Sequence, residues 1–349
     1  FCLRNYKYFK EDKDYEIFLK EEKNWLTDYC LFMAIKNSQK GICWIDWPDE
    51  LKDRHSKAVK EAEKELETEI NFYRFQQYCF TTQWRKLKKY ANKQGISIIG
   101  DVPIYVALDS SDAWANPEML QFDKDHNPKS VAGCPPDAFS ATGQLWGNPL
   151  YDWKKLKASG YDWWVQRMKH CLELYDVVRI DHFRGFDEYY AIPYGEKTAR
   201  KGEWEKGPGM DLFNTLNKKL ENLHVIAEDL GFLTESVLEM LKESGYPGMK
   251  VLQFAFDGSE DSAYLPYKYE HNCVVYTGTH DNETTKGWLE GLQGHDRDFV
   301  REYINCYEAP VNDCVWGLIR IALASVADLA VIPIQDYLCL GNEARMNAP

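Results

Sequence analysis

The chain has 349 residues, 44% of them hydrophobic and 28% charged, which is typical of a globular protein with a large core. Its net charge of −13 disfavours nucleic acids and anionic membranes as partners, whereas a neutral substrate meets no such penalty. We expect no membrane span and no signal peptide. The ten cysteines include no CxxC pair and no His at zinc-ligand spacing, which predicts reduced thiols in a cytoplasmic protein. We expect no cofactor.

Residues 1–95 are predicted to form a helical segment packed on the rest of the chain. In the stretch HSKAVKEAEKELETEINFYRF, apolar side chains recur every three or four residues and so mark one face of a helix. These side chains are Val59, Ala62, Leu66, Ile70 and Tyr73.

After Gly95 short apolar runs alternate with helix-like segments, an order typical of a parallel sheet. No glycine-rich phosphate turn follows any run, and polar residues follow nearly all of them. These features favour a (β/α)₈ TIM barrel over an open doubly wound sheet, because a barrel collects its catalytic residues at the carboxyl ends of its strands. The six predicted strands are ISIIGDVPI (96–104), VVRID (177–181), HVIAED (224–229), KVLQFAF (250–256), CVVYTGTHD (273–281) and LAVIPIQD (329–336).

Such a barrel needs two more strands than these six. We therefore assign residues 96–349 to a catalytic barrel containing strands three to eight, and expect the first two strands on the N-terminal side of this chain. Residue 1 is Phe rather than Met, and the final ARMNAP reads as the middle of a loop. Both ends are expected to be truncations.

Residues 101–153 interrupt the alternation of strands and helices. This long segment is rich in Pro, Gly, Asn and aromatic residues, and loops of such length inside a compact domain are usually functional. A surface insertion without function is the alternative, although four large aromatic side chains argue against it. Aromatic rings suit the apolar faces of sugars. The four are Trp114, Phe139, Trp146 and Tyr151.

The run VVRIDHFRGF places Arg179 and Asp181 two positions apart at a strand end. Side chains two apart on a strand share a face, and a nearby guanidinium favours an ionised carboxylate. An acid that stays charged in a sheltered site suits a nucleophile, although a buried ion pair that only supports the sheet explains the pattern equally well. His182 should point to the opposite side, either as a catalytic group or as a hydrogen-bonded core histidine.

Two further acidic sites follow other predicted strands. In VIAEDLG, the neighbouring Glu228 and Asp229 must point in different directions, so one can face the site while the other makes structural contacts. In YTGTHDNET, His280, Asp281 and Asn282 lie on a strand-to-loop turn.

Three carboxylates at one end of a sheet suit glycoside cleavage, which uses a nucleophile and a proton donor. Asp181, Glu228 and Asp281 are our candidates for the nucleophile, the acid and a third group that holds the sugar as its ring flattens. A Mg²⁺ or Ca²⁺ site is the competing interpretation, because clustered acids also bind divalent metals.

From about residue 25 to the end, the sequence resembles the 4-α-glucanotransferases, also called amylomaltases or disproportionating enzymes, of the α-amylase clan. The blocks that carry this resemblance occur in the family's order. They are GDVPIYVALDSSDAW, PPDAFSATGQLWGNPLYDW, VRIDHFRGF, AEDLG, YPGMKVLQFAF, VVYTGTHDNETT and GNEARMN. The resemblance implies retaining transfer of α-1,4-glucan segments between a maltodextrin donor and a maltodextrin acceptor. An α-glucan hydrolase and a catalytically impaired glucan-binding fragment are the alternatives.

The resemblance also implies roles for individual residues. Asp181 matches the nucleophile, Glu228 the general acid/base and Asp281 the transition-state stabiliser. Arg179 matches a group that keeps the nucleophile charged, and His280 a donor to substrate hydroxyls. Further sugar contacts are expected from Asp101, from Phe139, Gln144, Trp146 and Asn148 in the long loop, and from Asn347 in the terminal segment.

Overall fold

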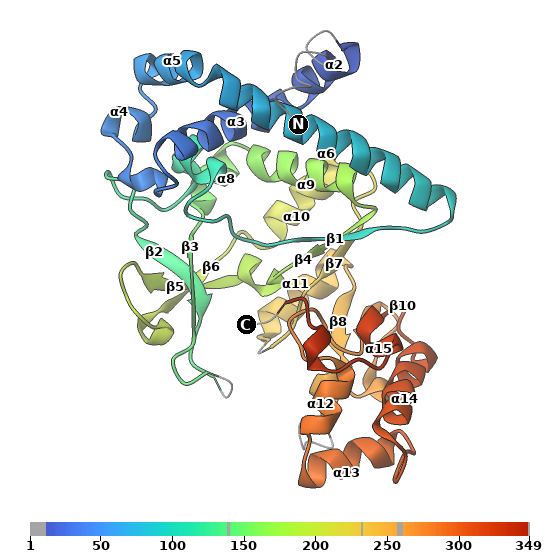
Figure 1. The fold of residues 1–349 in the computed structure, drawn as a ribbon. Coiled ribbons are helices and arrows are strands. Elements are labelled where there is room, and N and C mark those ends of the chain that lie inside the picture. The colour runs from blue at the N-terminus through green and yellow to red at the C-terminus, as the bar shows by residue number, and fades with distance from the viewer. Residues whose placement is uncertain (1–11, 138–139, 232, 257–260, 348–349) are drawn as a thin grey trace. The chain divides into compact units, whose positions relative to one another are not determined.

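The computed structural model describes residues 12–137, 140–231, 233–256 and 261–347. The chain packs as two compact units (Figure 1). The first contains Phe1–Val178 and Arg184–Leu223, and the second contains Arg179–Phe183 and His224–Pro349. All three predicted catalytic acids belong to the second unit.

The first unit opens with helices throughout the described part of residues 12–95. Asn37 on α3 donates a hydrogen bond to the hydroxyl of Tyr73 on α6, which ties these two helices together. Large aromatic side chains fill the core of this unit, and Trp44, Trp114 and Trp164 are fully buried. The helices are α2 (Lys13–Glu21), α3 (Lys23–Ser38), α4 (Asp49–Lys52), α5 (Ser56–Glu65), α6 (Glu67–Lys93), α7 (Ser111–Ala115), α8 (Trp153–Ala158), α9 (Asp162–Leu174) and α10 (Met210–Lys219).

A four-stranded antiparallel sheet also belongs to the first unit, with the order β3-β2-β5-β6. None of its four strands was predicted. Two of them, β2 and β3, lie in the segment 101–153 that was predicted as a loop, where Gly133 and Gly147 interrupt the periodicity. Their partners come from distant residues, as in the pair Ala132 and Ala191. The strands are β2 (Ser130–Cys134), β3 (Gln144–Pro149), β5 (Glu188–Pro193) and β6 (Glu203–Lys206).

Each of the six predicted strands overlaps an observed strand, and each observed strand is shorter than predicted. The overlap is smallest for β8, which begins at Gly248, before the predicted start at Lys250. Residues after Val251 form a 3₁₀ turn, and Pro333 precedes a short helix where the prediction extended a strand to Asp336. A proline has no backbone N–H to donate to a sheet, so the last predicted strand ends before it. The strands are β1 (Ile99–Val102), β4 (Val177–Ile180), β7 (Val225–Ala227), β8 (Gly248–Val251), β9 (Cys273–Tyr276) and β10 (Leu329–Val331).

These strands form two three-stranded sheets, with the orders β1-β4-β7 and β10-β9-β8. β1 belongs to the first unit, whereas β7, β8, β9 and β10 belong to the second. The backbone N–H of Glu228 donates to the carbonyl of Ile180, and that of Ala227 to the carbonyl of Pro247. β8 pairs with β9 and β9 with β10, in both cases parallel, as predicted. Among the described strands, β1 and β10 lie at the ends of their sheets.

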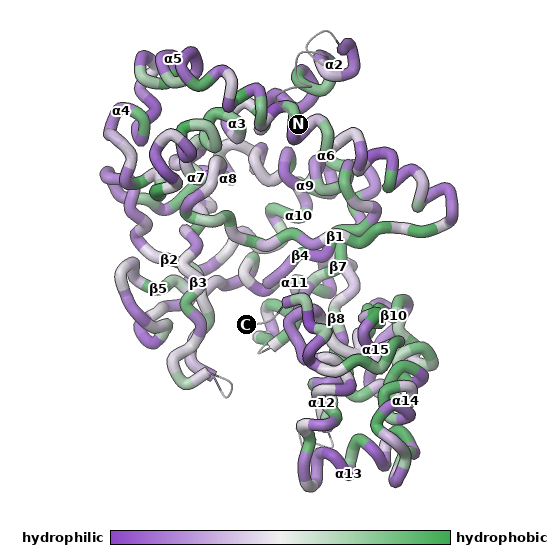
Figure 2. Tube along the Cα trace, viewed as in Figure 1, coloured by the Kyte–Doolittle hydropathy of each residue, from purple (hydrophilic) through white to green (hydrophobic). Residues whose placement is uncertain are grey.

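Helices cover the strands of the second unit. They are α11 (Glu235–Ser244), α12 (Thr285–Gly291), α13 (Gly294–Tyr303), α14 (Val311–Ala324) and α15 (Ile334–Tyr337). Figure 2 shows α14 as mostly hydrophobic and α13 as largely hydrophilic. Accordingly, Leu318 and Ile319 of α14 are buried in one core cluster with Val275 of β9. This packing supports β9 from behind and so supports the loop that follows it.

Candidate active site

Asp181 follows β4 immediately and pairs with Arg179, as the sequence predicts. Nη2 of Arg179 lies 3.0 Å from Oδ1 of Asp181. The arginine is 8% exposed, and its Nε also contacts the sulfur of Met249 at 3.3 Å. The side chain of Asp181 is 43% exposed. A buried cation therefore fixes one carboxylate oxygen while the side chain stays accessible to a ligand.

Glu228 follows β7 immediately and is half-buried. Its two carboxylate oxygens each accept a backbone hydrogen bond, one from the N–H of His182 at 2.8 Å and one from the N–H of Leu230 at 2.9 Å. His182 adopts a positive φ of 55°, so the chain turns sharply after Asp181 and presents this N–H to Glu228. The role of the His182 side chain stays a prediction.

The environment of Glu228 raises its pKa from 4.5 to about 7. Burial is the main cause, because a desolvated carboxylate is costly to ionise, and the negative charge of Asp181 adds to it. The two backbone donors and Arg179 oppose the rise. A carboxyl group that holds its proton near neutral pH beside an ion-paired carboxylate is the combination that acid-assisted nucleophilic chemistry requires.

Of the neighbouring acids Glu228 and Asp229, Asp229 makes the structural contacts. It is 5% exposed and accepts a hydrogen bond of 2.6 Å from the backbone N–H of Met249. Burial raises its pKa. At Gly248 a Cβ would lie 2.6 Å from Oδ2 of Asp229, so a side chain there would disturb this contact. Asp229 thus ties β7 to β8, while its neighbour Glu228 binds the backbone directly after Asp181.

Asp281 lies in the loop after β9, and its side chain is 63% exposed. Nδ2 of Asn347 donates to Oδ1 of Asp281 at 2.9 Å, and Nε2 of His280 lies 3.3 Å from Oδ2. Arg345 donates to the backbone carbonyl of Asp281 at 3.2 Å. The terminal segment is therefore a direct support of the third acid.

A cavity of about 430 Å³ opens beside this loop within the second unit. Its lining includes Arg179, His280 and Asn347 of the predicted set but none of the three acids. Arg345 and Tyr276, which were not predicted, also line it. Arg345 stands in the block GNEARMN, two positions before Asn347, so its even spacing from a predicted contact was the available signal. The cavity offers hydrogen-bond donors to a polar ligand beside the acids.

The remaining predicted sugar contacts belong to the first unit. On β3, Nε1 of Trp146 donates to Oε1 of Gln144 at 3.0 Å, so these two side chains share a face. Asn148 donates instead to the backbone carbonyl of Val106 at 2.9 Å, which supports the segment after β1. Asp101, the predicted contact on β1, is exposed. Phe139 lies outside the described residues.

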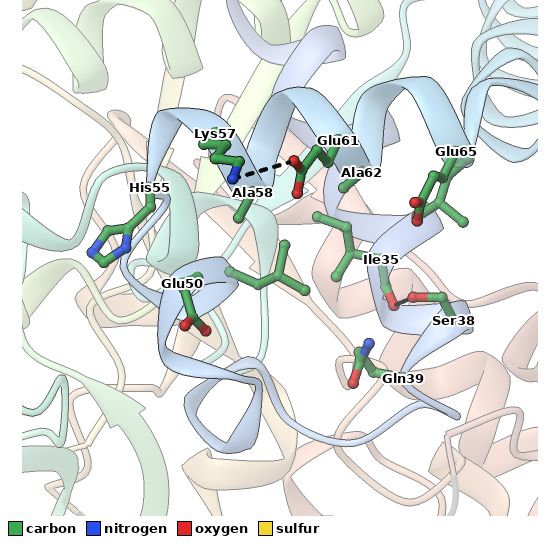
Figure 3. A pocket seen from close by; sticks show the side chains of 12 residues that line it. Ile35, Ser38, Gln39, Glu50, His55, Lys57, Ala58, Glu61, Ala62 and Glu65 are labelled. Atoms are coloured by element: carbon green, nitrogen blue, oxygen red, sulfur yellow. Dashed lines mark hydrogen bonds and ion pairs between the residues drawn. The ribbon is translucent and has the colours of Figure 1, made fainter.

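A larger cavity of about 720 Å³ lies among α3, α4 and α5 in the first unit (Figure 3). Ile35 and Ala62 contribute apolar surface, and Glu61 is paired with Lys57 at 4.0 Å. It contains no arginine-paired carboxylate and no backbone-bound acid among its lining residues. The candidate active site is therefore the cavity of the second unit.

Among the residues described, one group of side chains has the spacing to hold a metal ion, and it contains none of the predicted catalytic acids. Its members are Glu22, His170 and Glu173. Arg85 lies 3.0 Å from Glu22 and 3.5 Å from Glu173, so a guanidinium already balances these acids. Nine cysteines are free in the described part of the chain. Of the helices in that part, none combines the length and apolar character that crossing a membrane requires.

Comparisons with known proteins find the same kind of relative over nearly the whole chain. The family model for 4-alpha-glucanotransferase matches residues 2–349. A 4-alpha-glucanotransferase from Clostridium butyricum is 49% identical over 97% of this chain and 70% of its own length, and one from Synechocystis is 47% identical over 97% and 67%. The structure of an amylomaltase from Streptococcus agalactiae in complex with acarbose has a TM-score of 0.93 and 39% identity, covering 98% of this chain and 69% of that one.

Proposed function

Because this chain belongs to the 4-alpha-glucanotransferase family, we propose that it moves α-1,4-glucan segments from one maltodextrin to another through a covalent intermediate on Asp181. The observation that carries this proposal is the contrast between two neighbouring acids. Asp181 is paired with a buried guanidinium, whereas burial raises the pKa of Glu228 to about 7. One is suited to attack and the other to donate a proton.

In the first step a carboxylate oxygen of Asp181 attacks the anomeric carbon of the donor. The bond from that carbon to the bridging oxygen breaks, and Glu228 gives its proton to that oxygen, which leaves as the 4-hydroxyl of the shortened glucan. A glycosyl ester on Asp181 and a shortened glucan result.

In the second step the 4-hydroxyl of an acceptor glucan attacks the same carbon. Glu228, now a carboxylate, takes the hydroxyl proton, the ester bond breaks and Asp181 becomes a carboxylate again. Two inversions give retention of configuration. Asp281 stabilises the positive charge that develops on the sugar ring in both steps, and His280 donates to its hydroxyls.

We also propose that β1, β4, β7, β8, β9 and β10 are strands three to eight of a (β/α)₈ barrel in residues 96–349, with residues 1–95 as an added helical segment. The parallel pairing of β8, β9 and β10 and the acids directly after β4 and β7 support this proposal. The free cysteines support a reducing, cytoplasmic setting.

On the resemblance of their sequence blocks, Asp101, Phe139, Gln144, Trp146 and Asn148 are proposed sugar contacts. Trp146 is 37% exposed, which leaves its ring available for stacking on a sugar. If it binds acceptor, Trp146→Ala should raise the share of hydrolysis over transfer, since water then competes better for the ester. An unchanged product ratio in a folded variant would remove this role.

The test of the function is incubation of the purified chain with maltotriose, with products separated by length. Glucose together with maltodextrins longer than maltotriose is expected from transfer. Accumulation of short products alone would indicate a hydrolase, and binding without turnover a glucan-binding fragment. A parallel sample with chelator should behave identically, because no step uses a divalent metal.

A further inference from the structure

We propose that Asp336 is a positioning residue that anchors both ends of the loop bearing Asp281, an inference that rests on the proposed function of that loop. Asp336 lies on α15, after β10, and is 1% exposed. Asp281 is part of the segment that runs from the end of β9 to the start of α12. The two acids are far apart in sequence, and hydrogen bonds connect Asp336 to both ends of that segment.

At the first end, the hydroxyl of Thr277, directly after β9, donates to Oδ2 of Asp336 at 2.6 Å. At the second end, Thr285 opens α12, and its backbone N–H donates to Oδ1 at 2.8 Å while its hydroxyl donates to Oδ2 at 2.6 Å. Thr277 is 1% exposed and Thr285 is fully buried. A single carboxylate therefore holds the two points between which the catalytic loop must close.

The carboxylate itself is an unusual choice for this place. In the described part of the chain, the donors to the Asp336 carboxylate are these two threonines, and no Lys, Arg or His forms an ion pair with it. Burying an acid without a cation is costly, and three hydrogen bonds offset that cost only while all three donors are present. The arrangement is consequently sensitive to small displacements of either threonine.

Other hydrogen bonds brace residues 279–284 of the loop. Oδ1 of Asn282 accepts from the backbone N–H of Thr279 at 2.8 Å, and Gln253 donates to the carbonyl of Glu283 at 2.9 Å. Asn342 accepts from the N–H of Thr284 at 3.1 Å. Among these contacts, those of Asp336 alone join the start of the loop to its end.

The test uses matched substitutions of the two threonines rather than loss of the acid. Thr277→Val and Thr285→Val remove a donor and keep the shape, whereas Thr277→Ser and Thr285→Ser keep the donor. With maltotriose, each Val variant should lose roughly 10- to 100-fold in kcat with KM little changed, because misplacing a group that acts in the transition state affects turnover more than binding. The Ser variants should retain most of the activity.

Hydrogen exchange measured by mass spectrometry provides a readout that does not depend on catalysis. Amides of residues 278–284 should exchange faster in both Val variants than in wild type, and peptides of the first unit should not change. Thr81→Val, a buried substitution on α6, is the control for general loss of packing and should leave both the loop exchange and kcat unchanged.

Unchanged loop exchange in the Val variants would overturn the proposal, as would equal losses of kcat in the Val and Ser variants. If the wild-type chain does not convert maltotriose into longer maltodextrins, the proposed function fails instead. The exchange measurement then still decides whether Asp336 anchors the loop.

Discussion

Glu228 and Asp281 carry the same functional group on different kinds of support. Glu228 follows β7 immediately, is half-buried and has a backbone N–H bound to each carboxylate oxygen. Asp281 lies in a loop, is largely exposed and receives its hydrogen bond from the side chain of Asn347. The strand framework thus sets the position and proton affinity of the first acid, whereas neighbouring side chains set the position of the second.

This difference predicts which changes will affect each acid. The proton on Glu228 responds to burial and to the charge of Asp181, so pH and charge substitutions should reveal it. The position of Asp281 depends on its hydrogen-bond partners. Substitutions of those partners that leave every charge unchanged should therefore alter the activity that depends on Asp281.

The largest effect is expected at Asp181, which belongs to the strand-supported part of the site. Asp181→Asn removes the proposed nucleophile, and turnover of maltotriose should fall on the order of 10⁴-fold or more. Glucose release is the measurement. Asp162→Asn, an exposed acid on α9, is the control and should keep wild-type activity. Residual activity above a few per cent in pure Asp181→Asn would remove the assignment.

Glu228→Gln should be the next most severe change, with a loss of roughly 10²- to 10⁴-fold on maltotriose because no proton reaches the leaving oxygen. A maltosyl fluoride donor distinguishes this role from structural damage, since fluoride leaves without a proton. Release of fluoride in the first step should therefore be much less impaired than cleavage of maltotriose. Equal losses on both donors would contradict the acid role.

The pH dependence tests the charge environment of Glu228 directly. Above about pH 7 the acid loses its proton, so kcat/KM should decline by about tenfold per pH unit. In Asp181→Asn the nearby negative charge is gone, and the pKa of Glu228, followed by carbon NMR, should move downward while burial keeps it above 4.5. An unchanged pKa would show that burial alone is responsible.

The free energy of unfolding should also depend on the protonation of Glu228. The pKa of Glu228 is higher in the folded chain than its ordinary value of 4.5, so the folded state binds the proton more tightly between pH 4.5 and about 7. The free energy of unfolding should therefore fall as pH rises through this window, by up to about 3 kcal/mol from this group. Denaturant unfolding of wild type and Glu228→Gln at several pH values isolates this contribution.

The strand-supported part of the site was the more predictable from sequence. A buried apolar strand determines where its last residue points, so the pairing of Arg179 with Asp181 followed from their spacing of two. The division between Glu228 and Asp229 also followed from adjacent positions, although only the structure assigns burial to Asp229. These features could be predicted because they depend on residues only one or two positions apart in the sequence.

Contacts between residues far apart in the sequence could not be predicted in this way. The bond from Asn347 to Asp281 joins two loops, and the antiparallel sheet of the first unit pairs β2 with β5 across many intervening residues. Neither leaves a periodic pattern in either partner. Strand ends were also misplaced, because the predictions extended apolar runs beyond Val251 and Val331 into a turn and a proline-led helix.

The smallest expected effect tests the loop-supported acid. Asn347→Ala removes one hydrogen bond to Asp281, and a neutral partner of this kind contributes about 1 kcal/mol, so kcat should fall roughly fivefold. The loss should be independent of pH between 5 and 7, because Asn347 carries no charge, and the melting temperature should not move. Asn312→Ala, in the first turn of α14, is the matched control. A loss that varies with pH would link Asn347 to the proton on Glu228 and would erase the distinction between the two supports.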